Sequence, residues 1–457
     1  MSAPAGPALD RPVVLSGAGG APTLAVERFA LPCGLDVVVH PDLSLPQVAV
    51  HVAYHVGSSD DPPGRSGLAH LFEHVFKNSA HLEGRHHYEI LRRIGAADAN
   101  ASTGIDRTSY HQVVPAHQLE VALWLESDRM GYFLPAMTAA RLAAQQQVVR
   151  SERRQRYENT PYGQDRFATA AALYPADHPL HHLVIGEHED IAAVTLEEIF
   201  AFYRTWYVPA NAHLVIAGAV EVATARRLVE RFFGSFPAST RPARTQPAEP
   251  AAAPAASSVT VQDRFATLGR LHLAWRGPPP HSEEAAALEM LAAAWAQPGT
   301  GALWKRLVYE LQLAQRVSVW MVSHRLGTEL HVTADLRDQA APERVAAELE
   351  RELARVCGEP FDAAALARVV ARREAAMLWS LQGLARRAAD VQRHLYWYGQ
   401  PNAYGLELAR ARAVEPAAVQ RASQRTLAAG RIEVRTQAKA AAEAAAVTRQ
   451  ESADEAP

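Results

Sequence analysis

Hydrophobic and polar residues alternate at several places in the first half of the chain, with the two-residue period of a β-strand. The clearest case is 47–56, in which Val48, Val50, Val52 and Tyr54 alternate with smaller or polar residues. Strands are also predicted at 26–31 and 35–40, joined by a Pro-Cys-Gly turn as in a hairpin, at 99–114 as a strand, a turn and a strand, and at 213–218. The first half should therefore contain a β-sheet.

Segments with the 3.6-residue period of an amphipathic helix lie between these strands. Residues 66–77 separate into an apolar stripe and a polar stripe, and Ser66 is a candidate N-cap for this helix. Further helices are predicted at 88–94, 117–131, 137–158, 196–203 and 222–233.

The second half of the chain repeats this order of elements. Strands are predicted at 270–275, 314–322 and 329–334, and helices at 283–296, 303–311, 342–356 and 363–400. The sequence therefore predicts an α+β fold with two homologous domains, each a mostly antiparallel β-sheet covered by helices. The predicted segments are a disordered lead-in (1–23), a first domain (24–236), a linker (237–262), a second domain (263–436) and a disordered tail (437–457).

Composition excludes several classes of protein. The formal net charge of −3 over 457 residues argues against nucleic acid as the main partner. The two cysteines, Cys33 and Cys357, cannot form a disulfide framework or a thiolate metal site, so a metal would need histidine and carboxylate ligands. No apolar stretch is long enough to cross a membrane, and the N-terminus has no secretory pattern. A cytoplasmic location without a membrane partner is expected, unless the true start lies upstream of Met1.

The polar stripe of 66–77 contains His70, Glu73 and His74. Two histidines four residues apart lie one helical turn apart on the same side, so both can bind one zinc ion. Glu73 is then within reach of a water molecule on that ion. His-x-x-Glu-His is the inverted form of a common zinc-peptidase motif, although a polar helix face with a salt-bridging glutamate is an alternative interpretation. The matching segment of the second half, 287–293, has no histidine, so one zinc ion per chain is expected.

The sequence around this motif resembles the pitrilysin/insulinase family of zinc metallopeptidases, the inverzincins. The resemblance rests on His70-Leu-Phe-Glu-His74 within Gly57-Ser…Gly67-Leu-Ala-His, and on later motifs in the same order: Asn100-Ala-Ser-Thr, Asp106-Arg-Thr-Ser-Tyr110, Leu123-Trp-Leu-Glu-Ser-Asp-Arg-Met130, Glu158-Asn-Thr-Pro-Tyr-Gly163 and Ile185-Gly…Asp190-Ile. The resemblance implies that Glu152, in Val148-Val-Arg-Ser-Glu-Arg-Arg, is the third zinc ligand.

Other residues were weighed as the third ligand. Glu158 is a fallback, although a six-residue step from Glu152 turns it to a different helix face. Glu126 and Asp128 lie on a helix that is expected to pack beside the site. The histidines in polar or proline-rich contexts are more typical of surface or hydrogen-bonding roles; they are His86, His87, His178, His181 and His182.

A mechanism follows from zinc chemistry, in which zinc acidifies a bound water molecule and Glu73 removes its proton as general base. The resemblance further implies that a peptide substrate is added as an extra strand to an exposed sheet edge. The matching segment is 99–103, with Asn100 and Ala101 as the substrate-binding residues. Asn100 could equally satisfy the local backbone, as asparagines beside turns do.

The resemblance fails at one place. Complete enzymes of the family carry an arginine and, seven residues later, a tyrosine in the second domain, and these positions hold Val308 and Gln315 here. Tyr309 and Arg316 are each one residue away, which on a helix or strand turns a side chain elsewhere. Loss of an oxyanion donor costs about two to three orders of magnitude in rate. We therefore expect the catalytic half of a heterodimer, whose homologous, metal-free partner supplies the Arg/Tyr pair.

Two other functions remain open. One is a structural or assembly subunit of the same fold without catalysis, which the presence of His70, Glu73, His74 and Glu152 disfavours. The other is a maturase that removes leader peptides from one precursor, which the sequence cannot separate from general peptide degradation.

Overall fold

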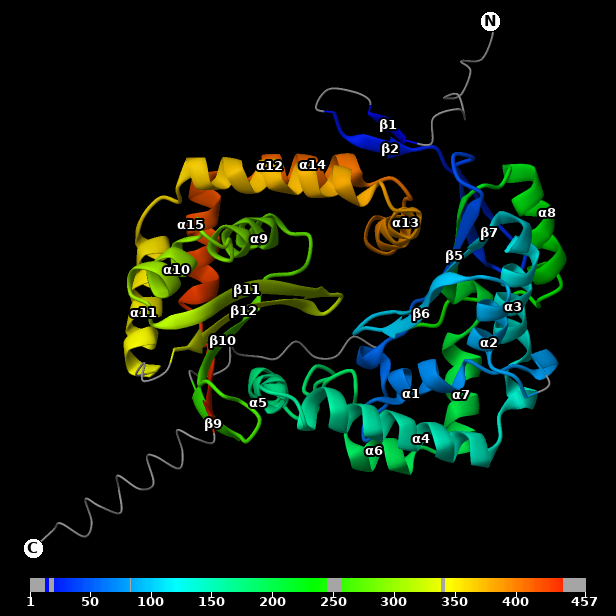
Figure 1. The fold of residues 1–457 in the computed structure, drawn as a ribbon, viewed down its shortest axis with the longest axis horizontal. Coiled ribbons are helices and arrows are strands. Elements are labelled where there is room, and N and C mark those ends of the chain that lie inside the picture. Colours follow the sequence, from blue (N-terminus) through cyan, green and yellow to red (C-terminus); the bar gives the residue numbers. More distant parts are fainter. Residues whose placement is uncertain (1–12, 16–19, 83, 245–256, 338–341, 439–457) are drawn as a thin grey trace, which may run out of the picture. The chain divides into compact units, whose positions relative to one another are not determined.

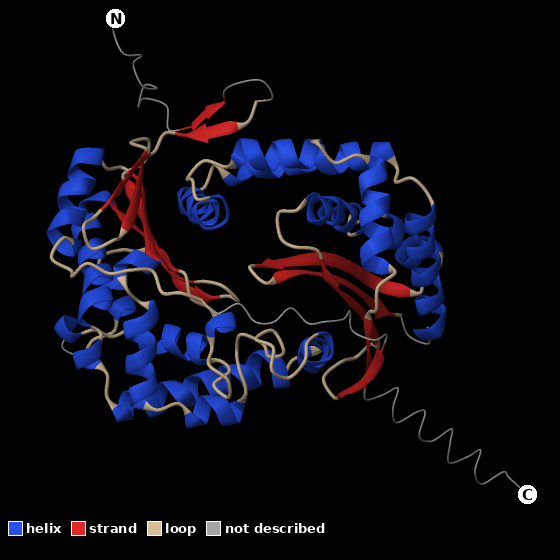
Figure 2. Ribbon diagram, turned by 180° about the vertical axis from the view of Figure 1, so that it is seen from behind, coloured by secondary structure: helices blue, strands red, loops and turns tan. Residues whose placement is uncertain are grey.

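The computed structural model describes residues 13–15, 20–82, 84–244, 257–337 and 342–438 (Figure 1). The contacts divide the chain into two compact units, each built from three separate segments. Unit 1 consists of residues 1–150, 184–245 and 373–408, and unit 2 of residues 151–183, 246–372 and 409–457. The predicted α+β architecture is confirmed, because each unit contains a large, mostly antiparallel sheet that helices cover (Figure 2).

The sheet of unit 1 has six strands in the order β3-β4-β8-β5-β7-β6. Their bounds are β3 Glu27–Ala30, β4 Asp36–Pro41, β5 Gln47–Tyr54, β6 Ala97–Thr103, β7 Thr108–Pro115 and β8 Ala212–Gly218. Only β4 and β8 pair in parallel. The predicted hairpin of β3 and β4 is present, and β6 forms the edge of the sheet beside β7. This edge matters below because it carries the residues predicted to bind substrate.

Helices cover both faces of this sheet. The helices of unit 1 are α1 Leu68–Val75, α2 His87–Arg93, α3 Leu119–Tyr132, α4 Ala139–Arg153, α6 His188–Ala193, α7 Leu196–Trp206, α8 Val222–Phe233 and α13 Leu384–Tyr398. Helices α3 and α8 pack together and against β4, β5 and β7, whereas α13 packs on β5, β7 and β8. Apolar residues of α13, Val391 and Leu395, meet Val38 and Val215 of the sheet in one buried cluster.

The sheet of unit 2 has five strands in the order β11-β12-β10-β13-β9. Their bounds are β9 Ser257–Asp263, β10 Arg270–Gly277, β11 Ala314–His324, β12 Gly327–Leu336 and β13 Ile432–Ala438. The helices are α5 Gly163–Leu173, α9 Glu283–Trp295, α10 Ala302–Trp304, α11 Pro342–Gly358, α12 Ala363–Ser380, α14 Tyr404–Arg412 and α15 Pro416–Leu427, of which α12 and α14 cross the division between the units.

Alternation along β10 shows how the two faces of this sheet differ. Leu271, Leu273 and Trp275 join the buried cluster formed with α9, α11 and α15. His272 points to the other face, where its Nδ1 lies 2.8 Å from the Asp165 carboxylate of α5. A segment from the first half of the sequence therefore completes unit 2, just as α13 from the second half completes unit 1.

Several predicted boundaries differ from the structure. The predicted lead-in contains two short strands, β1 Val13–Leu15 and β2 Pro22–Leu24, which pair with each other, and the end of the predicted linker is strand β9. The predicted helix 363–400 is interrupted between α12 and α13. The predicted tail after 438 lies outside the described residues. Both cysteines are free, and within the described part of the chain no helix is long and apolar enough to span a bilayer.

Candidate metal centre

Helix α1 is held in unit 1 by its apolar stripe. Leu68, Leu71, Phe72 and Val75 are fully or almost fully buried. The ring of Phe72 stacks on that of Tyr207 with the centroids 4.0 Å apart. Because the apolar stripe is anchored in this way, the opposite stripe with His70, Glu73 and His74 has a fixed orientation.

The start of α1 is fixed by Gly67 and Asp61, neither of which was predicted as a cap. The N-cap is Gly67, with φ 83°, and a Cβ there would lie 2.7 Å from the Ile185 carbonyl oxygen. The Asp61 carboxylate accepts hydrogen bonds from the Gly67 and Ala69 N–H groups, both at 2.8 Å, which satisfies free donors of the first turn. Burial raises the pKa of Asp61 well above its usual value, against the effect of these two hydrogen bonds.

The prediction of Ser66 as the N-cap is wrong. Its hydroxyl donates to the Asp190 carboxylate at 2.5 Å and accepts from the Glu187 N–H at 3.0 Å. The Ser66 side chain is therefore turned away from the first turn of α1. It connects the loop before α1 to the start of α6 instead.

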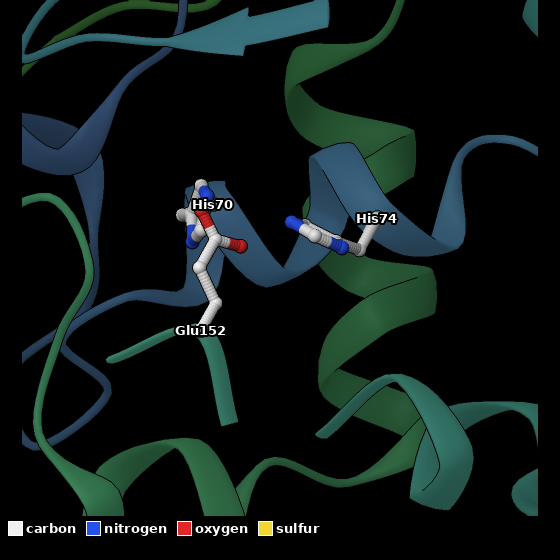
Figure 3. A group of neighbouring side chains, drawn as sticks. All are labelled: His70, His74 and Glu152. Atoms are coloured by element: carbon white, nitrogen blue, oxygen red, sulfur yellow. The ribbon is translucent and has the colours of Figure 1, made fainter. Parts of the chain in front are cut away.

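His70, His74 and Glu152 meet in one group. Each offers one possible ligand atom, and these three atoms lie within 4.8 Å of one another. Figure 3 shows the three side chains directed toward one another, the histidines from α1 and the glutamate from α4. Among the described residues this is the only group of three or more histidine, cysteine or acidic side chains so arranged.

Glu152 lies near the end of α4, and the contacts of that helix explain its position. The division between the units falls inside α4, after Arg150. The Gln146 side-chain amide donates to the carbonyl oxygens of Ile191 and Val194, both at 2.9 Å. These bonds attach α4 to unit 1, which also carries α1. A guanidinium nitrogen of Arg156 lies 2.9 Å from the Glu152 carboxylate.

The donor set fits zinc. Two imidazole nitrogens and one carboxylate oxygen are the ligands of a familiar hydrolytic zinc site, which keeps a fourth position open. Bonds of about 2.1 Å in tetrahedral geometry hold donors roughly 3.4 Å apart, so small side-chain movements would be enough to close the group around an ion. The predicted ligands are thus together.

Glu73 faces a strand. Its Oε2 accepts a 2.7 Å hydrogen bond from the Thr103 hydroxyl, at the end of β6. Glu73 is 6% exposed, so this contact fixes a largely buried carboxylate beside the two histidines. Thr103 lies in the predicted substrate segment 99–103, but its contact with Glu73 was not predicted, because the two residues are 30 positions apart in the sequence.

The predicted substrate strand is an edge strand, as required for adding another strand. Asn100 is exposed on it, and its side-chain oxygen accepts from the Ala101 N–H at 2.9 Å. This is the local backbone contact considered as the alternative for Asn100. An incoming peptide would have to replace that contact to use the Ala101 N–H.

The fallback ligands have other partners. Glu158 accepts from Arg153 at 2.9 Å. Glu126 is buried and accepts hydrogen bonds from Gln112 and Arg129, and its burial raises its pKa. Asp128 is hydrogen-bonded to Ser79 and His81. The remaining histidines have structural contacts: His86 caps α2, His87 is buried against Ser79, His178 accepts from the Leu180 N–H, and His181 donates to the Tyr174 carbonyl. His182 likewise lies outside the metal group.

The segment expected to carry the Arg/Tyr pair is irregular. Val308 lies in the π-helical segment Lys305–Glu310 (η7), beside the exposed Tyr309. A β-bulge between Ala314 and Arg316 breaks the regular alternation of β11, so Gln315 and Arg316 are both exposed. Because of this bulge, Arg316 is not turned away from the side of Gln315, contrary to the prediction for a regular strand.

Two family models match the chain. The one described as "Insulinase (Peptidase family M16)" matches residues 37–176, which include the metal group. The one described as "Peptidase M16 inactive domain" matches residues 193–373, where the sequence has no His-x-x-Glu-His motif. Together the two matches extend over most of both halves of the chain.

Similar proteins agree with these matches. A zinc protease of Helicobacter pylori named PqqE is 34% identical over 214 residues, which are 46% of this chain and 47% of that protein. An insulin-degrading enzyme-like protein of Arabidopsis thaliana is 26% identical over 48% of this chain and 23% of its own length. The chain thus spans about half, or less, of the length of these curated relatives.

Solved structures share the fold of most of the chain. A protease from Helicobacter pylori superposes with a TM-score of 0.83 at 24% identity, covering 90% of this chain and 99% of that one. The first half of the periplasmic protease PqqL from Escherichia coli gives a TM-score of 0.73 at 20% identity and covers 92% and 93%. At these identities the likeness establishes the fold alone.

Proposed function

Because this chain belongs to the insulinase (M16) family of peptidases, we propose that it is a zinc-dependent endopeptidase subunit that hydrolyses peptides or unfolded segments. The observation that carries the proposal is the grouping of His70, His74 and Glu152 within 4.8 Å. Relatives named as zinc proteases support the choice of metal.

His70, His74 and Glu152 would hold the ion, and Arg156 would orient Glu152 through their contact at 2.9 Å. When bound, zinc supplies a Lewis acid for the scissile carbonyl and lowers the pKa of water. Glu73 acts as the general base: its carboxylate takes the proton of the attacking water and delivers it to the leaving amine. Thr103 keeps that carboxylate in place.

We propose that the peptide is added as a strand along the edge of β6, beside Asn100 and Ala101. An edge strand offers backbone donors and acceptors, so recognition needs little from the side chains of the substrate. Folded proteins would be excluded, because their backbone groups are already paired. General degradation and leader-peptide maturation both agree with this mode of binding.

We further propose that the active protein is a heterodimer. Val308 has no hydrogen-bond donor in its side chain, and Gln315 offers only a neutral amide where the family pattern has a tyrosine hydroxyl. A homologous, metal-free subunit would supply the pair. The similarity in size to the first half of PqqL supports this arrangement, because that protease contains a second half in the same chain.

Zinc content and peptidase activity test the proposal. The purified chain should contain one zinc ion, and the Glu73→Gln variant should keep the ion but lose turnover, measured with a quenched fluorescent peptide. Addition of a metal-free homologue with an Arg/Tyr pair should raise the rate by about two orders of magnitude. Absence of zinc would favour the non-catalytic subunit, and full turnover by Glu73→Gln would remove the general base. A fully active isolated chain would contradict the heterodimer alone.

A further inference from the structure

A cavity of about 350 Å³ in unit 2 is lined by eleven residues, none of them acidic. They come from the segment that follows α4, from the start of α5, and from strands β10, β11 and β12. Four of the lining residues are arginines: Arg156, Arg166, Arg270 and Arg316. A cavity of this size has room for a ligand group, and its lining carries an unusual excess of positive charge.

Strand β11 forms one wall of the cavity. Arg316, Ser318 and Trp320 line the cavity together, as alternate residues of a strand do. Arg316 Nε donates to the Ser318 hydroxyl at 3.2 Å, and the Trp320 ring stacks on His331 with the centroids 5.0 Å apart. The indole is 39% exposed, so this wall combines a cationic group with an accessible apolar surface.

Residues 160–163, from the motif 158–163 to which the proposed mechanism gives no role, form another part of the lining. Tyr162 has φ 62°, and its N–H and hydroxyl donate to Asp263 and to the Leu268 carbonyl at 2.6 and 3.1 Å. Gly163 is required next, because a Cβ there would lie 1.6 Å from the Tyr157 carbonyl oxygen. These contacts make the wall rigid before any ligand arrives.

The four arginines differ in how their charge is balanced. Arg270 lies 3.5 Å above the Tyr162 ring and donates to Asp335 at 2.6 Å, and Arg156 pairs with Glu152. Within the described part of the chain, Arg166 and Arg316 form no ion pair with a carboxylate. Two guanidinium groups in one cavity without acidic partners favour an anion, and guanidinium groups match a carboxylate with two parallel hydrogen bonds.

We propose that this cavity binds a carboxylate of the peptide substrate, either an Asp or Glu side chain or the C-terminal carboxylate. The inference rests on the proposed peptidase function. Arg156 lies four residues after Glu152, about 6 Å along a helix, so the bound carboxylate belongs to a residue within a few positions of the scissile bond. Trp320 would contact the aliphatic part of that residue.

Binding measurements on the zinc-loaded Glu73→Gln variant test this inference without turnover. The probes are pairs of fluorescein-labelled nonapeptides. The two members of a pair have Glu or Gln at the same position, and this position is moved along the peptide from pair to pair. Each peptide is made with a free and with an amidated C-terminus. At one position the acidic peptide should bind about tenfold more tightly than its Gln counterpart, measured by fluorescence anisotropy at low salt. A side-chain carboxylate makes the preference depend on the Glu position, whereas a terminal one makes it depend on amidation.

Substitutions identify the cavity as the source of the preference. When Arg316→Gln or Arg166→Gln is combined with Glu73→Gln, the tenfold preference for the acidic peptide should disappear. The affinity for the neutral peptide should stay unchanged. Arg368→Gln, an exposed arginine of unit 2 outside the cavity, is the matched control for the loss of one charge and should keep the preference. Equal affinities for both peptides, binding of neither, or a preference that survives both cavity variants would overturn the inference. Zinc content and cleavage of a neutral peptide by the unsubstituted protein report separately on the proposed function.

Discussion

The Thr103 hydroxyl donates a 2.7 Å hydrogen bond to Oε2 of Glu73 and thereby joins the edge strand β6 to helix α1. The same strand is the proposed binding edge for the peptide, so one residue connects the substrate strand with the proposed general base. A carboxylate that must receive a proton from water needs a fixed position as well as the right chemistry. Thr103 is therefore a positioning residue for Glu73.

Thr103→Val keeps the shape of the side chain and removes the hydrogen bond. Loss of a hydrogen bond to a charged group corresponds to about a tenfold reduction in kcat, with KM and zinc content unchanged. Thr103→Ser should restore the rate because it keeps the hydroxyl. Ser102→Ala, which changes a neighbouring hydroxyl bonded to Ser109, is the control. An equal kcat in Thr103→Val would show that Glu73 does not depend on this contact.

Glu152 and Glu158 provide a direct comparison of the two candidate third ligands. Glu152→Gln should weaken zinc binding by about two orders of magnitude, because a neutral amide oxygen replaces an anionic ligand. Glu158→Gln should leave zinc affinity unchanged, since Glu158 pairs with Arg153 outside the metal group. Competition with a chromophoric chelator measures both affinities. The opposite order of effects would assign the site to Glu158.

Gly163 is a position where a single methyl group should not be tolerated. Gly163→Ala would place a Cβ 1.6 Å from a backbone oxygen, so the turn into α5 would have to move. We expect a loss of more than about 3 kcal/mol in the free energy of unfolding, or failure to fold. Gly358→Ala is the matched control, because a Cβ there meets nothing within 4 Å. Denaturant unfolding of both variants checks the difference; similar values would show that the turn adapts.

Local periodicity was sufficient to predict many elements. The helix predicted at 222–233 has those bounds as α8, because its apolar and charged residues follow one clear period. Strands β9 and β13 were missed. They pair with each other in parallel although about 170 residues separate them, and the polar, mostly exposed β9 has the composition of a linker. Long-range pairing, rather than local propensity, makes these segments strands.

The residues of the candidate site also fall into those that local sequence predicts and those that only the tertiary structure reveals. His70, Glu73 and His74 were identified from their spacing alone, because one helix brings them together. Glu152 was assigned only by family resemblance, and the structure brings it to the histidines through the contacts of α4. The roles of Asp61, Thr103 and the cavity arginines were not predicted. Thr103 reaches Glu73 from 30 residues away and the cavity arginines come from separate segments, whereas Asp61 caps α1 from the preceding loop, for which the sequence has no distinctive pattern. The sequence thus identifies the reactive groups, and the fold identifies what positions them.

The burial of His40 should make the stability of unit 1 depend on pH. His40 is completely buried below α13, where its Nδ1–H donates to the Ala25 carbonyl at 2.7 Å. Its Nε2 accepts from Arg387, which also pairs with Asp42. Burial lowers the pKa of His40 to about 4; the Arg387 charge acts in the same direction, while the Ala25 and Asp42 contacts oppose it.

A histidine with a lowered pKa in the folded state stabilises the protein fully above its unfolded value of about 6.5 and progressively less as the pH falls toward 4. For a pKa near 4, His40 alone should lower the free energy of unfolding by about 2 kcal/mol between pH 7 and pH 5. His40→Gln keeps one donor and one acceptor but cannot titrate. Urea unfolding of both chelator-treated proteins at the two pH values should show a smaller pH effect in the variant by about that amount. An unchanged pH effect would mean that His40 titrates alike in the folded and unfolded states, and that its burial against Arg387 does not exclude a proton.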